Sequence, residues 1–120
     1  MKPRIDHTKF GSITVGGEEF KYDIVIGPSG KVKKRKKKLS KAIYGTSHVI
    51  SLDEARYVYQ DGADRLIVGT GLFGRVELAQ DAADFFQEKG CQVDLLRNKK
   101  AVGAWNGAEG NVIGLFHVTC

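Results

Sequence analysis

Apolar and polar residues alternate along the first third of the chain in the way that is typical of half-buried β-strands. β-Branched and aromatic side chains dominate residues 10–15 and 20–26, and apolar positions in the second run recur at every other residue. The two glycines between these runs suit a tight hairpin turn, since glycine adopts positive φ without strain. A turn over residues 27–30 leads to a third strand near Val32. We therefore predict that this third of the chain forms an antiparallel β-meander.

The rest of the chain switches between helical and extended periods. Residues 39–50 fit neither pattern, but Ser51 and Glu54 have the spacing of a capping box and open a helix. Asn98 is a candidate N-cap for the last helix. Further strands are predicted at 66–68, 91–96 and 111–118, and further helices at 80–89 and 98–107. The order is three strands followed by α-β-α-β-α-β, which indicates parallel strands joined by crossovers in one α/β domain, residues 1–120.

Length and composition describe an ordinary globular domain. The 120 residues are 42% hydrophobic and 28% charged, which is enough to bury a core without disulfides. The two cysteines, Cys91 and Cys120, are too few for a disulfide scaffold, so we expect free thiols. The first ten residues contain no apolar run, and no stretch reaches the ~20 apolar residues of a membrane span. We therefore expect a cytoplasmic protein without a membrane segment.

Positive charge is concentrated in one segment. Residues 31–41, here called the basic segment, hold eight basic residues and no acid, while the formal net charge of the chain is only +5. Such a segment could bind nucleic acid or another polyanion through its phosphates. The same residues would also suit a solvated strand edge, where lysines discourage aggregation. The candidate polyanion-binding residues are Lys33, Lys34, Arg35, Lys36, Lys37 and Lys38.

A glycine-rich loop, residues 69–74, follows the apolar strand at 66–68. Its Gly-x-Gly-x-x-Gly spacing, with Asp94 downstream, matches the dinucleotide-binding fingerprint in letters. The helical pattern begins only near Gln80, however, whereas the fingerprint needs a helix N-terminus at the second glycine. The alternative is that glycine lets the loop turn tightly. A small-ligand pocket at this carboxyl end of the strand remains open, with the candidate residues Ser47, His48, Gly69, Thr70, Gly71 and His117.

No arrangement of residues in the sequence specifies catalysis. The chain has no Cys-x-x-Cys or His-x-x-x-His spacing, so we expect no metal. Adjacent Ser47 and His48 do not make a dyad by sequence proximity alone, because catalytic groups are arranged in space. Trp105 and the four tyrosines are not interleaved with the lysines, which favours core positions over base stacking. We assign no catalytic residue and expect no cofactor.

Several pieces of the chain together resemble one family. They are Phe10-Gly11, Asp23-Ile24-Val25-Ile26-x-Pro28-Ser29-Gly30, Gly45-Thr46-Ser47-His48, Val68-Gly69-Thr70-Gly71 and Phe116-His117-Val118-Thr119-Cys120. In order and spacing they resemble the adipogenesis-associated Mth-domain family, which includes a mitochondrial NADH dehydrogenase assembly factor. The Gly-Thr-Ser-His and His-x-Thr-Cys pieces are most similar to archaeal members.

The resemblance covers nearly the whole chain and implies a compact α/β domain with a central mixed sheet. It also implies a protein that acts by binding, since archaeal members have no established activity and eukaryotic members resemble assembly or regulatory proteins. The chain departs from the family in its lysine-rich 31–38 stretch and in the helix that carries Gly103, Trp105 and Gly107.

Three functional hypotheses follow. The preferred one is a non-enzymatic binding or assembly module with a protein partner. The second is a binder of nucleic acid or another polyanion through residues 31–41. The third is a small-ligand or enzyme site that joins the glycine-rich loop to Ser47 and His48.

Overall fold

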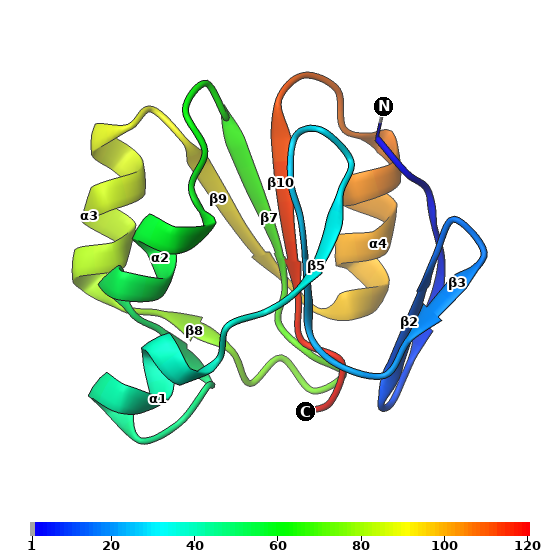
Figure 1. Ribbon diagram of the computed structural model, residues 1–120, viewed down its shortest axis with the longest axis horizontal. Helices are drawn as coiled ribbons and strands as arrows, with labels where there is room; N and C mark the ends of the chain where they lie inside the picture. Colours follow the sequence, from blue (N-terminus) through cyan, green and yellow to red (C-terminus); the bar gives the residue numbers. More distant parts are fainter. Residues whose placement is uncertain (1) are drawn as a thin grey trace.

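A five-stranded mixed sheet forms the centre of the protein in the computed structural model, which describes residues 2–120 (Figure 1). The order across the sheet is β5 (Val32–Lys34), β4 (Ile24–Ile26), β10 (Val112–Phe116), β7 (Arg65–Gly69) and β9 (Gln92–Leu96). β7 is parallel to both of its neighbours, β9 and β10, whereas β4 and β5 continue the sheet as antiparallel strands. The expected α/β fold with a central mixed sheet is thus confirmed.

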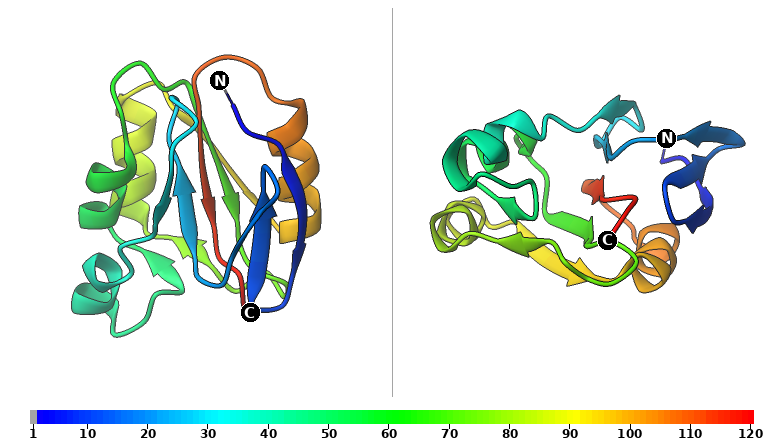
Figure 2. Two further views of the ribbon diagram at one scale, coloured as in Figure 1. Left: turned by 45° about the vertical axis from the view of Figure 1, so that its right-hand side comes forward. Right: turned by 90° about the horizontal axis from the view of Figure 1, so that it is seen from below.

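The two faces of this sheet carry different layers (Figure 2). One face is covered by α1 (Lys38–Tyr44), α2 (Leu52–Val58) and α3 (Gln80–Glu88), with a short parallel pair β6 (Val49–Ile50) and β8 (Glu77–Leu78) beside them. The other face is covered by α4 (Asn98–Gly107) and by an antiparallel three-stranded sheet of β1 (Ile5–Lys9), β2 (Ser12–Val15) and β3 (Glu18–Phe20). Among residues 2–120, no helix has the length and apolar character needed to cross a bilayer.

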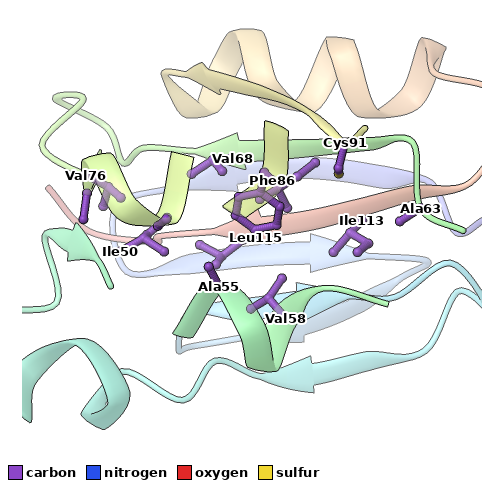
Figure 3. Close-up of a cluster of buried hydrophobic side chains, with 13 residues drawn as sticks. Ile50, Ala55, Val58, Ala63, Val68, Val76, Phe86, Cys91, Ile113 and Leu115 are labelled. Atoms are coloured by element: carbon purple, nitrogen blue, oxygen red, sulfur yellow. The ribbon is translucent and has the colours of Figure 1, made fainter. Parts of the chain in front are cut away.

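Alternation along the central strands builds a hydrophobic core on each side of the sheet. In β7, Leu66 and Val68 belong to the cluster under α2 and α3, where Phe86 is also buried (Figure 3). The residue between them, Ile67, points to the opposite side and joins the cluster with Trp105. A strand with apolar residues on both faces has a continuous apolar run in its sequence, which is the pattern that predicts it.

The N-terminal meander is present, but it lies one strand earlier than predicted. Sequence patterns miss the first strand, Ile5–Lys9, because charged and polar residues dominate it. The predicted strand at 20–26 is two strands in different sheets, since β3 ends at Phe20 and β4 begins at Ile24. Asp23 marks the break. Its side chain is buried and hydrogen-bonded, whereas the alternating pattern of a strand predicts that it points outward to solvent.

Two predicted helix caps differ from the structure in an informative way. The Ser51 hydroxyl does accept a hydrogen bond from the Glu54 backbone N–H at 3.1 Å, as in a capping box. The Glu54 carboxylate, however, turns into the protein toward Arg35 and Ser40. Asn98 does not cap α4, because its side chain bonds to other loops. Helix α1, in the segment that fits neither pattern, ends at Gly45 with a φ of 70°.

Candidate functional site

A buried cluster of charges lies where β4, β5 and α2 meet. The Arg35 guanidinium makes a bidentate contact with Glu54, with Nε to Oε2 at 2.6 Å and Nη2 to Oε1 at 3.0 Å. Its Nη1 donates to Asp23 Oδ2 at 3.0 Å, and Nη2 also donates to the Ser47 carbonyl at 2.8 Å. All three charged side chains are at most 1% exposed. Two carboxylates around one guanidinium satisfy the donors that burial would otherwise leave unpaired.

The surroundings keep Asp23 ionised despite its burial. Burial by itself raises the pKa of this carboxyl, but hydrogen bonds from the His117 ring and the Val118 amide, the charge that His117 carries when it is protonated, and the charge of Lys37 lower the pKa to about 2. Burial likewise lowers the pKa of Arg35, and its contacts with Glu54 and Asp23 outweigh this and raise the pKa. Asp23 is therefore a carboxylate, and an acceptor only, throughout the physiological range.

Asp23 also anchors a histidine from the end of β10. His117 Nδ1 lies 2.7 Å from Asp23 Oδ2, and its Nε2 lies 3.0 Å from the Thr119 hydroxyl. His117 is buried at 2% exposure, whereas Thr119 is half-buried. The His48 ring packs edge-on against His117, with the ring centroids 5.3 Å apart. Burial lowers the pKa of His48, as do the nearby charges of Arg75, Arg35 and Lys37 and the charge that His117 carries when it is protonated.

The glycine-rich loop is packed against the last residues of the chain. A Cβ on Gly69 would lie 2.5 Å from the Phe116 ring, and one on Gly71 would lie 2.3 Å from the Cys120 backbone carbon. Gly71 also has a φ of 104°, which L side chains rarely adopt. These glycines are thus required by close packing and by a left-handed turn, as the second interpretation of the motif proposes.

Backbone donors of this loop are already used within the protein. Every backbone N–H from residue 70 to residue 76 donates to a protein acceptor. The acceptors include the Asn98 side chain for Gly71 and the main-chain oxygen of Cys120 for Phe73 and Arg75. A phosphate cradle needs N–H groups that point to the ligand. Asp94 in turn bonds to Arg65 at 2.6 Å, so the letters of the dinucleotide fingerprint describe internal packing in this chain.

The basic segment forms the wall of an open groove. This groove, here called the lysine-lined groove, has a volume of about 690 Å³. It is lined by Asp23, Val118 and Thr119 together with Lys21, Tyr22, Lys34, Arg35, Lys36, Lys37 and Lys38. Lys34, Lys36 and Lys38 are exposed, and Lys37 is half-buried with its ammonium 3.6 Å from Asp23 Oδ2. Arg35 differs from the lysines in the predicted set of polyanion-binding residues. Its side chain is buried and donates to Asp23, Glu54 and the Ser47 carbonyl, whereas the lysines around it are exposed or half-buried.

A second, smaller groove lies next to the first, with Lys34 in the wall of both. It has a volume of about 280 Å³ and is lined in part by Lys31, Lys33 and Tyr57. Two exposed tyrosines stand beside the lysines: Lys34 Nζ is 5.3 Å from the Tyr22 ring, and Lys36 Nζ is 4.7 Å from the Tyr57 ring. The expectation that the aromatic residues occupy core positions holds for Trp105, which is fully buried, but is wrong for Tyr22 and Tyr57, which are 39% and 48% exposed.

The structure brings most of the predicted ligand-binding residues together. The contacts that they make there are with the last residues of the chain itself. His48 contacts His117, and a Cβ on Gly71 would lie 2.9 Å from the His117 ring. Ser47 joins through its carbonyl, which Arg35 binds. Thr70 turns away, because its hydroxyl donates to the Leu96 carbonyl in β9.

Sequence reasoning misses four participants: Asp23, Glu54, Asn98 and Thr119. Asp23 and Thr119 lie within the pieces that resemble the family, and that is the only available signal for them. Local patterns assign Glu54 and Asn98 to helix caps, since a capping residue and a long-range partner have the same letters.

Known proteins share this architecture along the whole chain. The solved structure of PH1505, a conserved hypothetical protein from Pyrococcus horikoshii OT3, matches with a TM-score of 0.89 and 31% identity, over 98% of this chain and 99% of its own. MT938 matches with a TM-score of 0.81 and 30% identity, over 99% of this chain and 100% of its own. A protein from Bordetella pertussis, described as a Mth938-like domain, shares the fold at 16% identity with a TM-score of 0.63, over 97% of this chain and 85% of its own.

The family assignment rests on these relatives and on a direct match. None of the curated proteins matches the chain. Residues 5–116 match the family described as "Protein of unknown function (DUF498/DUF598)". The resemblance to the Mth-domain family drawn from the sequence is confirmed, and the chain belongs to the Mth938-like proteins of the DUF498/DUF598 family.

Proposed function

We propose that this protein is a binding module for single-stranded nucleic acid, which it contacts through the two neighbouring grooves that the lysines of the basic segment line beside β5. The observation that carries the proposal is the combination of exposed lysines with two exposed tyrosines at their sides. Lysines that follow a groove neutralise phosphates, and aromatic rings offer a stacking surface to unpaired bases. The groove lies at the edge strand of the sheet, where an extended ligand has access.

The distribution of charge supports an anionic ligand over a neutral protein partner. Outside the basic segment the chain carries more acid than base, so the excess of positive charge is concentrated in this segment. The buried Arg35 contributes little to that excess, because Asp23 and Glu54 balance it. The exposed lysines repel one another, and a bound polyanion relieves that repulsion.

The test measures affinity for a labelled single-stranded oligonucleotide of about ten bases, a length within the known range of single-strand binding sites. The variant replaces Lys33, Lys34, Lys36 and Lys38 with Gln. A matched control replaces four exposed lysines elsewhere, namely Lys9, Lys89, Lys99 and Lys100. Both variants change the net charge equally. We expect the groove variant to lose binding and the control to keep most of it.

Salt dependence and stacking refine the test. If about four phosphates are contacted, the logarithm of the binding constant falls with the logarithm of salt concentration with a slope of about −3. Tyr57→Leu removes one stacking surface and should weaken binding by about 1–3 kcal/mol. Equal affinity for polyglutamate, with no effect of the tyrosine change, would instead identify an acidic protein surface as the ligand and overturn the nucleic-acid proposal.

A further inference from the structure

One group in the lysine-lined groove is not explained by anion binding. Thr119 is one of the residues that line the groove, and its hydroxyl is 3.0 Å from His117 Nε2, while His117 Nδ1 is 2.7 Å from Asp23 Oδ2. A buried carboxylate, a buried imidazole and the hydroxyl of a half-buried threonine thus follow one another in hydrogen-bond contact. We propose that Asp23, His117 and Thr119 form a catalytic relay in which Thr119 is the nucleophile toward carboxylic esters that carry a negative charge.

The hydrogen bonds define where the protons lie. Asp23 accepts from the Val118 amide and from Arg35 as well as from His117, so it serves as an acceptor and His117 Nδ1 carries the proton. In neutral His117, Nε2 then has a free lone pair and accepts the hydrogen bond from the Thr119 hydroxyl. This is the arrangement that activates an alcohol: a base beside the nucleophile, held in the correct tautomer by a carboxylate.

The differing exposure of the three residues suits these roles. Asp23 and His117 are buried at 1% and 2% exposure, so water does not compete for the hydrogen bond between them. Thr119 is half-buried and is one of the residues that line the groove, so it is the member of the three that is nearest to a bound substrate. Lys37, whose ammonium is 3.6 Å from Asp23 Oδ2, belongs to the same groove and offers a charge partner to an anionic substituent of the ester.

The proposed chemistry has two balanced steps. Thr119 Oγ1 attacks the ester carbonyl and gives its proton to His117 Nε2. The bond from the carbonyl carbon to the leaving oxygen then breaks, and that oxygen takes the proton from His117, which leaves an acyl-threonine and a free alcohol. Water attacks the acyl group, passes its proton to His117, and the proton returns to Thr119 Oγ1 as the carboxylic acid departs.

Labelling with an alkyl fluorophosphonate tests the nucleophile directly. An activated hydroxyl attacks phosphorus, the P–F bond breaks, and fluoride leaves while His117 takes the proton. We expect the phosphonyl group on the peptide that contains Thr119. Thr119→Val should abolish the label and Thr119→Ser should retain it. Thr8→Val, in β1, is the control and should behave as wild type, since the Thr8 hydroxyl donates to the Ser12 carbonyl. Folded wild-type protein without label on Thr119 would overturn the proposal.

The base and the substrate charge have separate tests. His117→Gln should slow labelling by about 10²–10⁴-fold, as loss of a general base does. Should that variant not fold, the comparison of wild type with Thr119→Val still decides, because Thr119 lies near the surface. Hydrolysis of p-nitrophenyl hemisuccinate should exceed that of p-nitrophenyl acetate at low salt. Faster hydrolysis of the acetate would contradict the proposed preference for negatively charged esters. Hydrolysis by Thr119→Val at the wild-type rate would contradict the role of Thr119 as nucleophile.

This inference does not depend on nucleic-acid binding. The fluorophosphonate is neutral, so its reaction needs Thr119 and His117 but not the lysines. Loss of oligonucleotide binding in the lysine variant says nothing about labelling, and absent labelling leaves oligonucleotide binding untouched. The two results can therefore fail separately.

Discussion

Two segments of this protein have sequences typical of anion binding, but in the structure they differ in whether their donor groups are already bonded within the chain. The glycine-rich loop matches a phosphate-binding fingerprint, but each backbone N–H from residue 70 to residue 76 is bonded within the chain. The basic segment matches no structural fingerprint, yet its lysines line an open groove. An anion site requires donors without internal partners. Free donors, rather than the letters of a motif, therefore distinguish the two segments.

The same principle applies within the basic segment itself. Arg35 has two carboxylates as partners and is buried, while Lys34 and Lys36 on either side are exposed. One cation thus holds β5 to the rest of the protein, and its neighbours remain available to a ligand. Neighbouring cations in this segment thus differ in burial and partners, and four perturbations test this division and the comparison with the glycine-rich loop.

Arg35→Ala should have the largest effect. It leaves Glu54 and Asp23 as buried charges without their shared partner, and such losses typically cost about 3–5 kcal/mol. The free energy of unfolding in urea measures the cost. Lys33→Ala, two residues earlier and exposed, should change it by less than about 0.5 kcal/mol. The double change Arg35→Met with Glu54→Gln should cost less than Arg35→Met alone, since fewer charges remain unpaired. Similar losses for Arg35 and Lys33 would remove the distinction between them.

Gly71→Ala addresses the other segment. A methyl group there would meet the Cys120 backbone at 2.3 Å with φ at 104°, and strained backbone and overpacking together should cost about 3 kcal/mol. Gly62→Ala is the matched control, because Gly62 also has positive φ at 87° but nothing within 4 Å. It should cost only about 1–2 kcal/mol. The thermal unfolding midpoints of the two variants give the comparison. If they agree, the loop is not packed against the C-terminal residues as tightly as described.

Acid should weaken the charge cluster that Asp23 shares with His117. The pKa of Asp23 is lowered to about 2 from its ordinary value of 3.8, so the folded state binds this proton less readily than the unfolded state. Stability from this source is complete above about pH 4 and is lost as the pH falls toward 2, and it amounts to roughly 2 kcal/mol. Unfolding free energies between about pH 5 and pH 2 measure it. Asp23→Asn should be less stable at pH 5 and show a shallower acid loss, and an unchanged slope would contradict this.

Much of the fold follows from patterns that are local in the sequence. The apolar run at 66–68 and the helix at 80–89 are predictable because burial on both faces, or on one helical face, leaves a distinct period. The split between Phe20 and Ile24 is not predictable in this way. A single buried aspartate is indistinguishable in sequence from an outward-facing polar residue in an alternating strand.

The site is predictable only where its residues follow one another in the chain. His117 and His48 are candidates from the sequence, but their contact depends on the residue before β6 and the residue after β10 meeting in space. Nothing local separates Arg35 from the lysines around it, since its burial is decided by Glu54 in a helix that follows in the chain. Long-range pairing of charges leaves no periodic signal, and it therefore escapes an argument from spacing.

The smallest effect on stability is expected from the lysines that differ most from Arg35. Replacing Lys33, Lys34, Lys36 and Lys38 with Gln removes mutual repulsion and also removes the contacts of Lys34 with Tyr22 and of Lys36 with Tyr57. These terms oppose each other, and exposed cation–π contacts contribute only about 0.5–1 kcal/mol each. We expect the free energy of unfolding to change by less than about 1 kcal/mol. Relative to the wild-type protein, the variant should be more stable at low salt than at high salt, because repulsion between the lysines is least screened at low salt. Urea unfolding at low and high salt measures this.

The outcome bears on why these lysines stand together. If the quadruple variant keeps its stability but loses the anionic ligand, the lysines serve binding and the fold does not require them. A loss above about 2 kcal/mol, beyond the usual range for exposed positions, would instead make them part of the framework that Arg35 anchors. Like charges gathered at and just after one edge strand, without a benefit to stability, are then best understood as a surface that binds a ligand of opposite charge.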